Sequence, residues 1–169
     1  MSGWIELLRE AGGDPMTESA LAHMDGDLER LKRVATYFRA RVPTLAQRVT
    51  VNSSHDDGPL FVNGDPILLE WAIESLAKNA IDALAGRDGI VDMTATALPE
   101  GHVRVRVSDN GPGIPRELGS RIFEPGFSTK EHGWGIGLPL ARRIVRENHG
   151  GELVLVPSER GATFDIILS

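Results

Sequence analysis

The apolar positions of the first forty residues recur at three- and four-residue steps. Between Thr17 and about Arg41 they form one stripe, consisting of Leu21, Met24, Leu28, Leu31, Val34, Ala35 and Phe38. Charged residues fill the other positions, which predicts an amphipathic helix. Residues 4–8 are typical of the end of an earlier helix, and residues 12–15 of a turn. We therefore expect a helical hairpin with only the end of its first arm, although such a stripe also occurs on helices that pack against their own domain.

Beyond Pro43 the pattern changes, and a globular domain is expected over residues 44–169. Short strands are predicted at 48–52 and 60–62, with a turn-rich segment between them. Asp65 and Pro66 then begin a long helix, Asp65 as the N-cap and Pro66 at the first position, where its missing N–H costs nothing. The apolar face of this helix consists of Leu69, Ala72, Ile73, Leu76, Ala80, Ala83 and Leu84. Gly86 and Gly89 are expected to end it.

The rest of the chain alternates between strands and one further helix. Strands at 90–97 and 102–108 are joined by a hairpin turn, and the valines of the second strand alternate with Arg104 and Arg106. A helix is predicted over 138–148, followed by strands at 152–156 and 163–168. This layout predicts a mixed sheet with helices on one face, preceded by a helical region over residues 1–43.

Composition excludes several classes of protein. Hydrophobic residues make up 41% of the 169 residues and charged residues 25%, which fits one folded domain with a helical appendage. The net charge of -6 argues against a general nucleic-acid binder, and the absence of cysteine excludes disulfides and thiolate chemistry. No apolar run approaches the roughly 20 residues that span a bilayer. We expect a cytoplasmic location without membrane contact by this chain, and any membrane tether would lie outside it.

A polar face on the long helix carries the first candidate chemistry. Ser75, Asn79 and Asp82 lie on one side of it by helical spacing. The uncharged carbonyl oxygen of Asn79 suits a hard cation that keeps some of its waters and also binds nucleotide phosphates. Taken alone, an asparagine on a helix is more often a solvated surface residue.

A second motif, from Asp109 to Ile114, follows a predicted strand. A carboxylate fixed at a strand end can accept a hydrogen bond from an exocyclic amine, and Gly111 and Gly113 let a flat ring approach the backbone. This arrangement suits the recognition of adenine. The same tripeptide of Asp, Asn and Gly is also common in ordinary turns.

Two loops complete the candidate site. Phe123 and Phe127 bracket a bend and could anchor a mobile lid, beyond which Lys130 could contact phosphate or simply be solvated. Further on, spaced glycines at 133, 135 and 137 lead into a helix. Glycines of this kind let backbone N–H groups face an anion, and the helix N-terminus adds partial positive charge. A lone Gly-x-Gly-x-Gly also suits a flexible connection, and it is not the dinucleotide-binding fingerprint.

In this order, the four stretches resemble the N, G1, F and G2 boxes of the histidine-kinase branch of the Bergerat-fold ATPases. The resemblance runs from about Val49 to Ser169 and implies an α/β (α+β) two-layer sandwich with a largely antiparallel sheet. It implies that Asn79 is the Mg²⁺ ligand and Asp109 the acid that recognises the adenine of ATP. Further ATP contacts are implied for Asp82, Gly111, Gly113, Ile114, Lys130, Gly133, Trp134, Gly135, Ile136, Gly137, Leu138 and Thr163.

The chain also departs from the family pattern. Ser75 stands where kinases often have Asn and where hydrolytic relatives such as gyrase place a general-base Glu. Glu74 is one residue away, which rotates it by about 100° around the helix. Water activation is therefore unsupported, and Glu74 is interpreted as a catalytic partner that orients the acceptor. An exposed salt-bridge role for Glu74 is equally compatible with the sequence.

Residues 1–43 resemble part of the kinase dimerisation region, but without its phosphoacceptor motif. The residues after His23 do not match that motif, and the other histidines, His55, His102, His132 and His149, are interpreted as surface or loop residues. The resemblance thus implies a protein-histidine kinase module of a two-component system. It would transfer the γ-phosphoryl group of ATP to a histidine outside this chain, for onward transfer to a response-regulator aspartate.

Such a module needs partners. The resemblance implies a response-regulator receiver domain and a histidine-bearing dimerisation domain, and a homodimer through the N-terminal helices is compatible with it. The chain by itself is expected not to phosphorylate itself. Two alternatives remain open at this point: a hydrolytic ATPase of the same fold, and a non-catalytic module for nucleotide binding or dimerisation.

Overall fold

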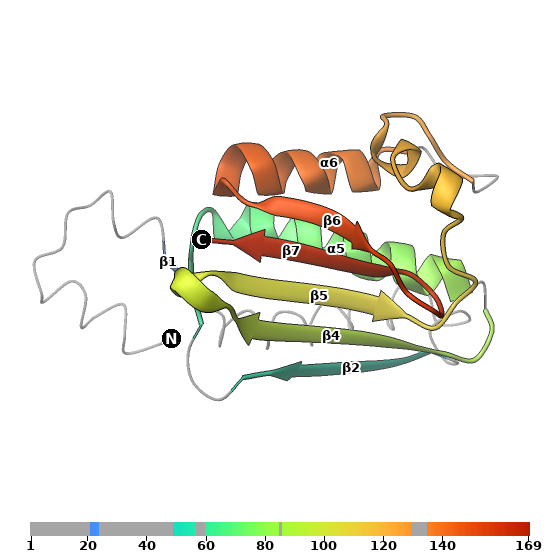
Figure 1. Cartoon of the computed structure of the whole chain (residues 1–169), viewed down its shortest axis with the longest axis horizontal. Coiled ribbons are helices and arrows are strands. Elements are labelled where there is room, and N and C mark those ends of the chain that lie inside the picture. The colour runs from blue at the N-terminus through green and yellow to red at the C-terminus, as the bar shows by residue number, and fades with distance from the viewer. Residues whose placement is uncertain (1–20, 24–48, 57–59, 85, 130–134) are drawn as a thin grey trace, which may run out of the picture.

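The protein is built around one five-stranded sheet. The computed structural model describes residues 21–23, 49–56, 60–84, 86–129 and 135–169 (Figure 1). The strands lie in the order β2-β4-β5-β7-β6, and their bounds are β2 Val49–His55, β4 Gly89–Ala97, β5 Val103–Asp109, β6 Glu152–Val156 and β7 Thr163–Leu168. Among these described strands, β2 and β4 pair in parallel and the other neighbours pair antiparallel. With α5 (Pro66–Leu84) and α6 (Gly137–Arg143) on one face, the predicted mixed, largely antiparallel two-layer fold is confirmed.

Helix α5 begins and ends where the local signals predict. The Asp65 carboxylate accepts hydrogen bonds from the backbone N–H groups of Ile67 at 2.8 Å and Leu68 at 3.2 Å, so it caps the helix. At the other end Gly86 adopts a φ of 74°, a left-handed conformation that favours glycine. The helix is therefore bounded by its own sequence rather than by distant contacts.

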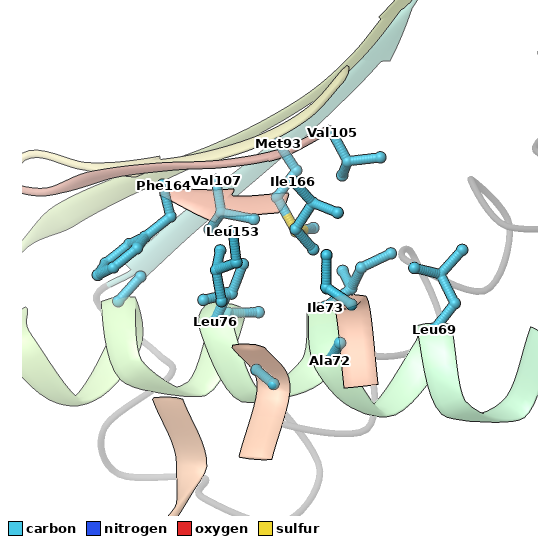
Figure 2. Packing of buried hydrophobic residues seen from close by; sticks show 14 of the residues in the cluster. Leu69, Ala72, Ile73, Leu76, Met93, Val105, Val107, Leu153, Phe164 and Ile166 are labelled. Carbon is cyan, nitrogen blue, oxygen red and sulfur yellow. The ribbon is translucent and has the colours of Figure 1, made fainter. Parts of the chain in front are cut away.

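The core lies between α5 and the inner face of the sheet. Figure 2 shows side chains of α5 pointing toward those of the strands. Fully buried members of this cluster include Leu69, Leu76, Met93, Val105, Val107, Leu153 and Ile166. Each large side chain buried in this way stabilises the fold by roughly 1.5–3 kcal/mol. Because the apolar stripe of α5 is fixed to the sheet, its polar stripe faces away from the core.

The outer face of the sheet is polar, as the alternation along β5 predicts. Arg106 pairs with Asp165 through two hydrogen bonds, from Nε at 2.6 Å and from Nη2 at 2.7 Å. The two residues are register partners on neighbouring strands. Asp165 is nevertheless buried. The two hydrogen bonds from the Arg106 guanidinium satisfy its carboxylate, which makes this burial tolerable.

A buried histidine joins the far end of the second helix to the start of the first. Helix α6 continues into a π-helical turn at Ile144–Asn148, and the ring of His149 follows it. Its Nδ1 lies 3.1 Å from the carbonyl oxygen of Ile144, and its Nε2 lies 3.1 Å from that of Asp65. Gly64 makes room for the ring, because a Cβ there would overlap His149. The interpretation of His149 as a surface or loop residue is wrong, because its side chain is buried. This burial depends on the Asp65 carbonyl group, 84 residues away, which no local sequence pattern indicates.

The N-terminal prediction is wrong where the structure describes it. Leu21–His23 form a strand, β1, which pairs antiparallel with β3 (Phe61–Asn63) instead of continuing a helix. Pairing between the two strands satisfies backbone N–H and C=O groups of both, and this outweighs a weak helical preference over three residues. The rest of the predicted hairpin lies outside the described residues. No helix in the described ranges is long and apolar enough to cross a membrane.

Candidate functional site

A cleft of about 730 Å³ lies between α5, the segment after β5 and the start of α6. The predicted site residues that line it are Asn79, Asp82, Asp109, Gly113, Ile114, Gly135, Ile136, Gly137 and Leu138. They come from three separate stretches of the chain, so the fold brings most of the predicted site together. Glu74, Gly111 and Thr163 do not line the cleft. Lys130, Gly133 and Trp134 lie outside the described residues.

Helix α5 forms one wall of the cleft. Ser75, Asn79 and Asp82 line it together, which is the polar face that their spacing predicts. Lys78 also lines it, and its Nζ lies 2.8 Å from Oδ2 of Asp82. The helix therefore presents an amide, a hydroxyl and an ion pair along a single wall.

Asp109 lies at the end of β5 and is held by the loop before β7. Its Oδ1 accepts hydrogen bonds from the backbone N–H groups of Gly111 at 2.8 Å and Ala162 at 3.4 Å. Its own N–H donates to the carbonyl oxygen of Ala162 at 2.9 Å. Burial raises the pKa of the Asp109 carboxyl above its ordinary value, and the two backbone N–H groups oppose this only in part. Oδ2 receives neither bond, so the carboxyl group can accept a hydrogen bond from a ligand in the cleft.

Close contacts explain why glycine occupies several positions beside Asp109. Gly113 has a φ of 79°, and a Cβ on it would lie 2.9 Å from the carbonyl oxygen of Gly161. Gly161 has a φ of 71°, and a Cβ there would overlap the carbonyl oxygen of Asp109. A Cβ on Gly111 would lie 2.8 Å from Oδ1 of Asp109. These glycines keep the end of β5 packed against the loop before β7.

The glycines at 135 and 137 bring the start of α6 to the cleft. Gly135 has a φ of 63°, and a Cβ on it would lie 2.6 Å from the carbonyl oxygen of Phe127. Its own carbonyl oxygen accepts a hydrogen bond from the N–H of Gly126 at 2.9 Å. A Cβ on Gly137 would lie 2.8 Å from Oγ of Ser75 on α5. The first N–H groups of a helix have no partner within the helix, so the start of α6 can donate hydrogen bonds to an anion.

Comparison with known proteins identifies the family. Residues 64–169 match the family model described as Histidine kinase-, DNA gyrase B-, and HSP90-like ATPase. The chain belongs to this family. Sporulation kinase C of Bacillus subtilis (strain 168) is 32% identical over 140 residues, which cover 83% of this chain and 32% of that protein. The chain thus spans about a third of the length of this curated relative.

Solved structures agree with this assignment. The catalytic domain of histidine kinase ThkA superposes with a TM-score of 0.75 at 29% identity, covering 88% of this chain and 94% of that one. The structure of ThkA in complex with the response regulator TrrA superposes with a TM-score of 0.71 at 25% identity, covering 96% and 45%. The predicted resemblance to the catalytic, ATP-binding domain of sensor histidine kinases is confirmed.

The segment after the G1 box, which the sequence predicts to be a lid, has aromatic contacts in its described part. Arg121–Phe123 form a short 3₁₀ helix in which Ile122 is buried. The ring of Phe123 packs edge-to-face on that of Phe164 with centroids 6.3 Å apart, and the Arg142 guanidinium lies 4.6 Å from its centroid. Phe127 lines the cleft. The two phenylalanines therefore connect the segment to the sheet and to the cleft.

Thr163 and Glu74 are two of the predicted site residues that do not line the cleft. The hydroxyl oxygen of Thr163 lies 2.8 Å from that of Ser108 on the neighbouring strand, and its neighbour Ala162 lines the cleft instead. Strand alternation places the two on opposite faces. Glu74 is half-buried on α5 beside the cleft wall, as its rotation from Ser75 predicts. The sequence also gave no reason to select Lys78, because a lysine paired at helical spacing is typical of a solvated surface.

Proposed function

We propose that this chain is the ATP-binding catalytic module of a two-component sensor kinase. It transfers the γ-phosphoryl group of ATP to a histidine on a dimerisation domain, from which a response-regulator aspartate receives it. The observation that carries the proposal is that Asn79, Asp109 and the start of α6 all line one cleft. These three features suit a hydrated divalent cation, an exocyclic amine and a phosphate respectively.

The contacts of α5 support one orientation of the nucleotide. Ser75 lies beside Gly137 at the start of α6, where an anion is favoured. Ala83 lies beside Gly111, because a Cβ on that glycine would be 3.6 Å from the Ala83 carbonyl oxygen. Eight residues of α-helix separate these two points by about 12 Å. The phosphates therefore belong near Ser75 and the adenine near Ala83, with Asn79 between them.

Phosphoryl transfer depends mainly on positioning and charge, so the chain needs little covalent chemistry of its own. Asp109 holds the base, while the N–H groups at the start of α6 hold the phosphates in place. Asn79 would supply one oxygen ligand to a Mg²⁺ ion carried by the nucleotide, and that ion would neutralise charge on the phosphates.

Exposed apolar side chains on the two helices support the docking of a partner. They are Ile67 and Trp71 on α5, Ile136 just before α6 and Leu140 on α6, with exposed fractions between 42% and 63%. Helices α5 and α6 run antiparallel, since Gly137 lies beside Ser75 and His149 beside Asp65. Trp71 and Leu140 are each about one turn from the Ser75–Gly137 contact, on the same stretch of the helix pair. Exposed apolar surface marks interaction sites, and the histidine-bearing dimerisation domain is the partner proposed for these side chains.

A transfer assay tests this function. The chain is incubated with Mg²⁺ and γ-labelled ATP, alone and with complete histidine-bearing dimerisation helices fused upstream of residue 44. We expect acid-labile, base-stable phosphohistidine on the added helices and scarcely any label on the chain alone, because no placed acceptor is then in line with the γ-phosphate. Label mapped to His23 or another internal histidine would contradict the proposal. Steady phosphate release without an acceptor would instead support a hydrolase.

Replacing Asn79 by alanine tests the cation site separately. We expect Asn79→Ala to weaken the binding of a non-hydrolysable ATP analogue about tenfold with Mg²⁺ and by much less without it, because only the metal ligand is removed. Calorimetric titration with and without Mg²⁺ measures both values. Asn52→Ala is the control, since Asn52 bonds Asp92 on the sheet away from the cleft at 2.8 Å. Equal losses with and without the metal would remove Asn79 from the cation site.

A further inference from the structure

The cleft has few positive charges for a ligand that carries several negative ones. Among the described residues that line it, the acidic side chains are Asp82 and Asp109, and the basic side chain is Lys78. A polyphosphate binds most strongly where ammonium or guanidinium groups can donate charge-assisted hydrogen bonds. Lys78 is therefore the described side chain with both the charge and the place to meet the phosphates.

The position of Lys78 on α5 corresponds to the phosphate end of the cleft. Lys78 follows Ser75 by three residues, which places it on the same side of the helix and about 4.5 Å further along the axis. Ser75 lies beside Gly137 at the start of α6. The adenine end, marked by the contact between Ala83 and Gly111, lies more than one further turn away. A lysine at this level can reach phosphate but is displaced from the base.

Asp82 holds the lysine without occupying all of its donors. The Nζ of Lys78 lies 2.8 Å from Oδ2 of Asp82, and the two side chains are 59% and 29% exposed. An exposed pair of this kind adds little to stability, and the order of Lys before Asp along a helix is the less favourable one. An ammonium group has three N–H donors, so donors remain for a ligand. What the pair achieves is to keep the ammonium group at the wall of the cleft.

We propose that Lys78, positioned by Asp82, binds the phosphate chain of the nucleotide and makes the site select nucleotides by their phosphates. This inference rests on the proposed function, since it requires ATP in the cleft. It assigns to α5 a phosphate-binding role that is separate from the cation site at Asn79. Lys78 contacts the ligand, and Asp82 acts through Lys78.

Substitution of Lys78 by glutamine tests the proposal. Calorimetry with the whole chain measures the dissociation constants of a non-hydrolysable ATP analogue, ADP and adenosine. We expect Lys78→Gln to weaken the ATP analogue about tenfold and to leave adenosine unchanged, because one charge-assisted phosphate contact is lost. The affinity for the ATP analogue should also depend less on salt than in the wild type. Lys78→Arg should stay within about threefold of wild type, since it keeps the charge.

A matched ion pair outside the cleft provides the control. Arg143 and Glu147 on the second helix are also four residues apart, with Nε and Oε2 at 2.8 Å, and neither lines the cleft. Arg143→Gln should therefore leave all three affinities unchanged. Equal weakening of adenosine and the ATP analogue by Lys78→Gln, or no weakening of either, would overturn the inference. Failure of the wild-type chain to bind any of the three ligands would contradict the proposed function itself.

Discussion

Asp109→Asn is expected to weaken ATP binding by about 100-fold or more while the domain stays folded. The substitution replaces a carboxylate oxygen at the cleft by an amide, which presents a donor toward the exocyclic amine of adenine. The amide oxygen can still accept the hydrogen bonds from Gly111 and Ala162, so the end of β5 keeps its structure. Calorimetric titration and thermal denaturation measure the two effects. Unchanged ATP affinity in the folded variant would remove Asp109 from the adenine site.

The same variant should change how stability depends on pH. Burial raises the pKa of the Asp109 carboxyl from its ordinary value near 3.8, so the folded state keeps its proton to a higher pH than the unfolded state. Between these two pKa values the folded state binds more protons, and its stability falls as the pH rises through that window. At neutral pH the wild type therefore carries the full cost of burying the charge. Asp109→Asn should lack this pH-dependent loss and melt at an equal or higher temperature.

Exposed acidic residues provide the comparison for this pH dependence. Asp92 accepts a hydrogen bond from Asn52 on the outer face of the sheet and is exposed. Asp92→Asn should retain the wild-type loss of stability through the Asp109 window. If the melting temperatures of the wild type and Asp109→Asn change with pH in the same way across this range, the charge on Asp109 is not destabilising. The argument from burial is then wrong.

Gly161→Ala is expected to reduce the free energy of unfolding by about 3 kcal/mol or more. A Cβ at this position would overlap the carbonyl oxygen of Asp109 and lie 2.6 Å from its carbonyl carbon. These are backbone atoms at the end of β5, so they cannot move aside without breaking the pairing with the loop before β7. Chemical denaturation of both proteins measures the difference. ATP affinity should fall as well, because Asp109 would be displaced.

Substitution of a second glycine, Gly101, separates the cost of a left-handed backbone from the cost of atomic overlap. Gly101 has a φ of 79°, but a Cβ on it would meet nothing within 4 Å. Gly101→Ala should therefore cost only the roughly 1–2 kcal/mol of a left-handed alanine and leave ATP affinity unchanged. Equal losses of stability in the two variants would mean that the overlap at Gly161 relaxes freely.

Local signals were sufficient for much of the fold. The capping carboxylate of Asp65 and the glycine after α5 bound that helix within a few residues of chain, and β6 and β7 begin and end at the predicted residues. Features that depend on distant partners were not predictable in this way. The burial of His149 requires a carbonyl group 84 residues away, and strand β1 requires the edge of β3.

The same distinction between local signals and contacts made only in the fold applies to the candidate site. Asn79, Asp109 and Gly137 could be found because family motifs name them, and all three line the cleft. Thr163 was also named by the resemblance, but the alternation of β7 directs its hydroxyl toward Ser108. Lys78 was missed because only the folded cleft distinguishes it from other lysines on helical surfaces.

The reciprocal hydrogen bonds between Asp109 and Ala162 connect ligand binding to the last strand. They join residues 53 positions apart, so the carboxyl group reaches its binding position only when the loop before β7 is in place. A chain still emerging from the ribosome would therefore have no adenine site until residues 162–168 are released, even with α5 and β5 already formed. Because ATP would bind only the finished domain, ATP at 100 times its dissociation constant would add about 2.7 kcal/mol to its stability. ATP would thus stabilise completed domains against unfolding and would not stabilise chains that are still being synthesised.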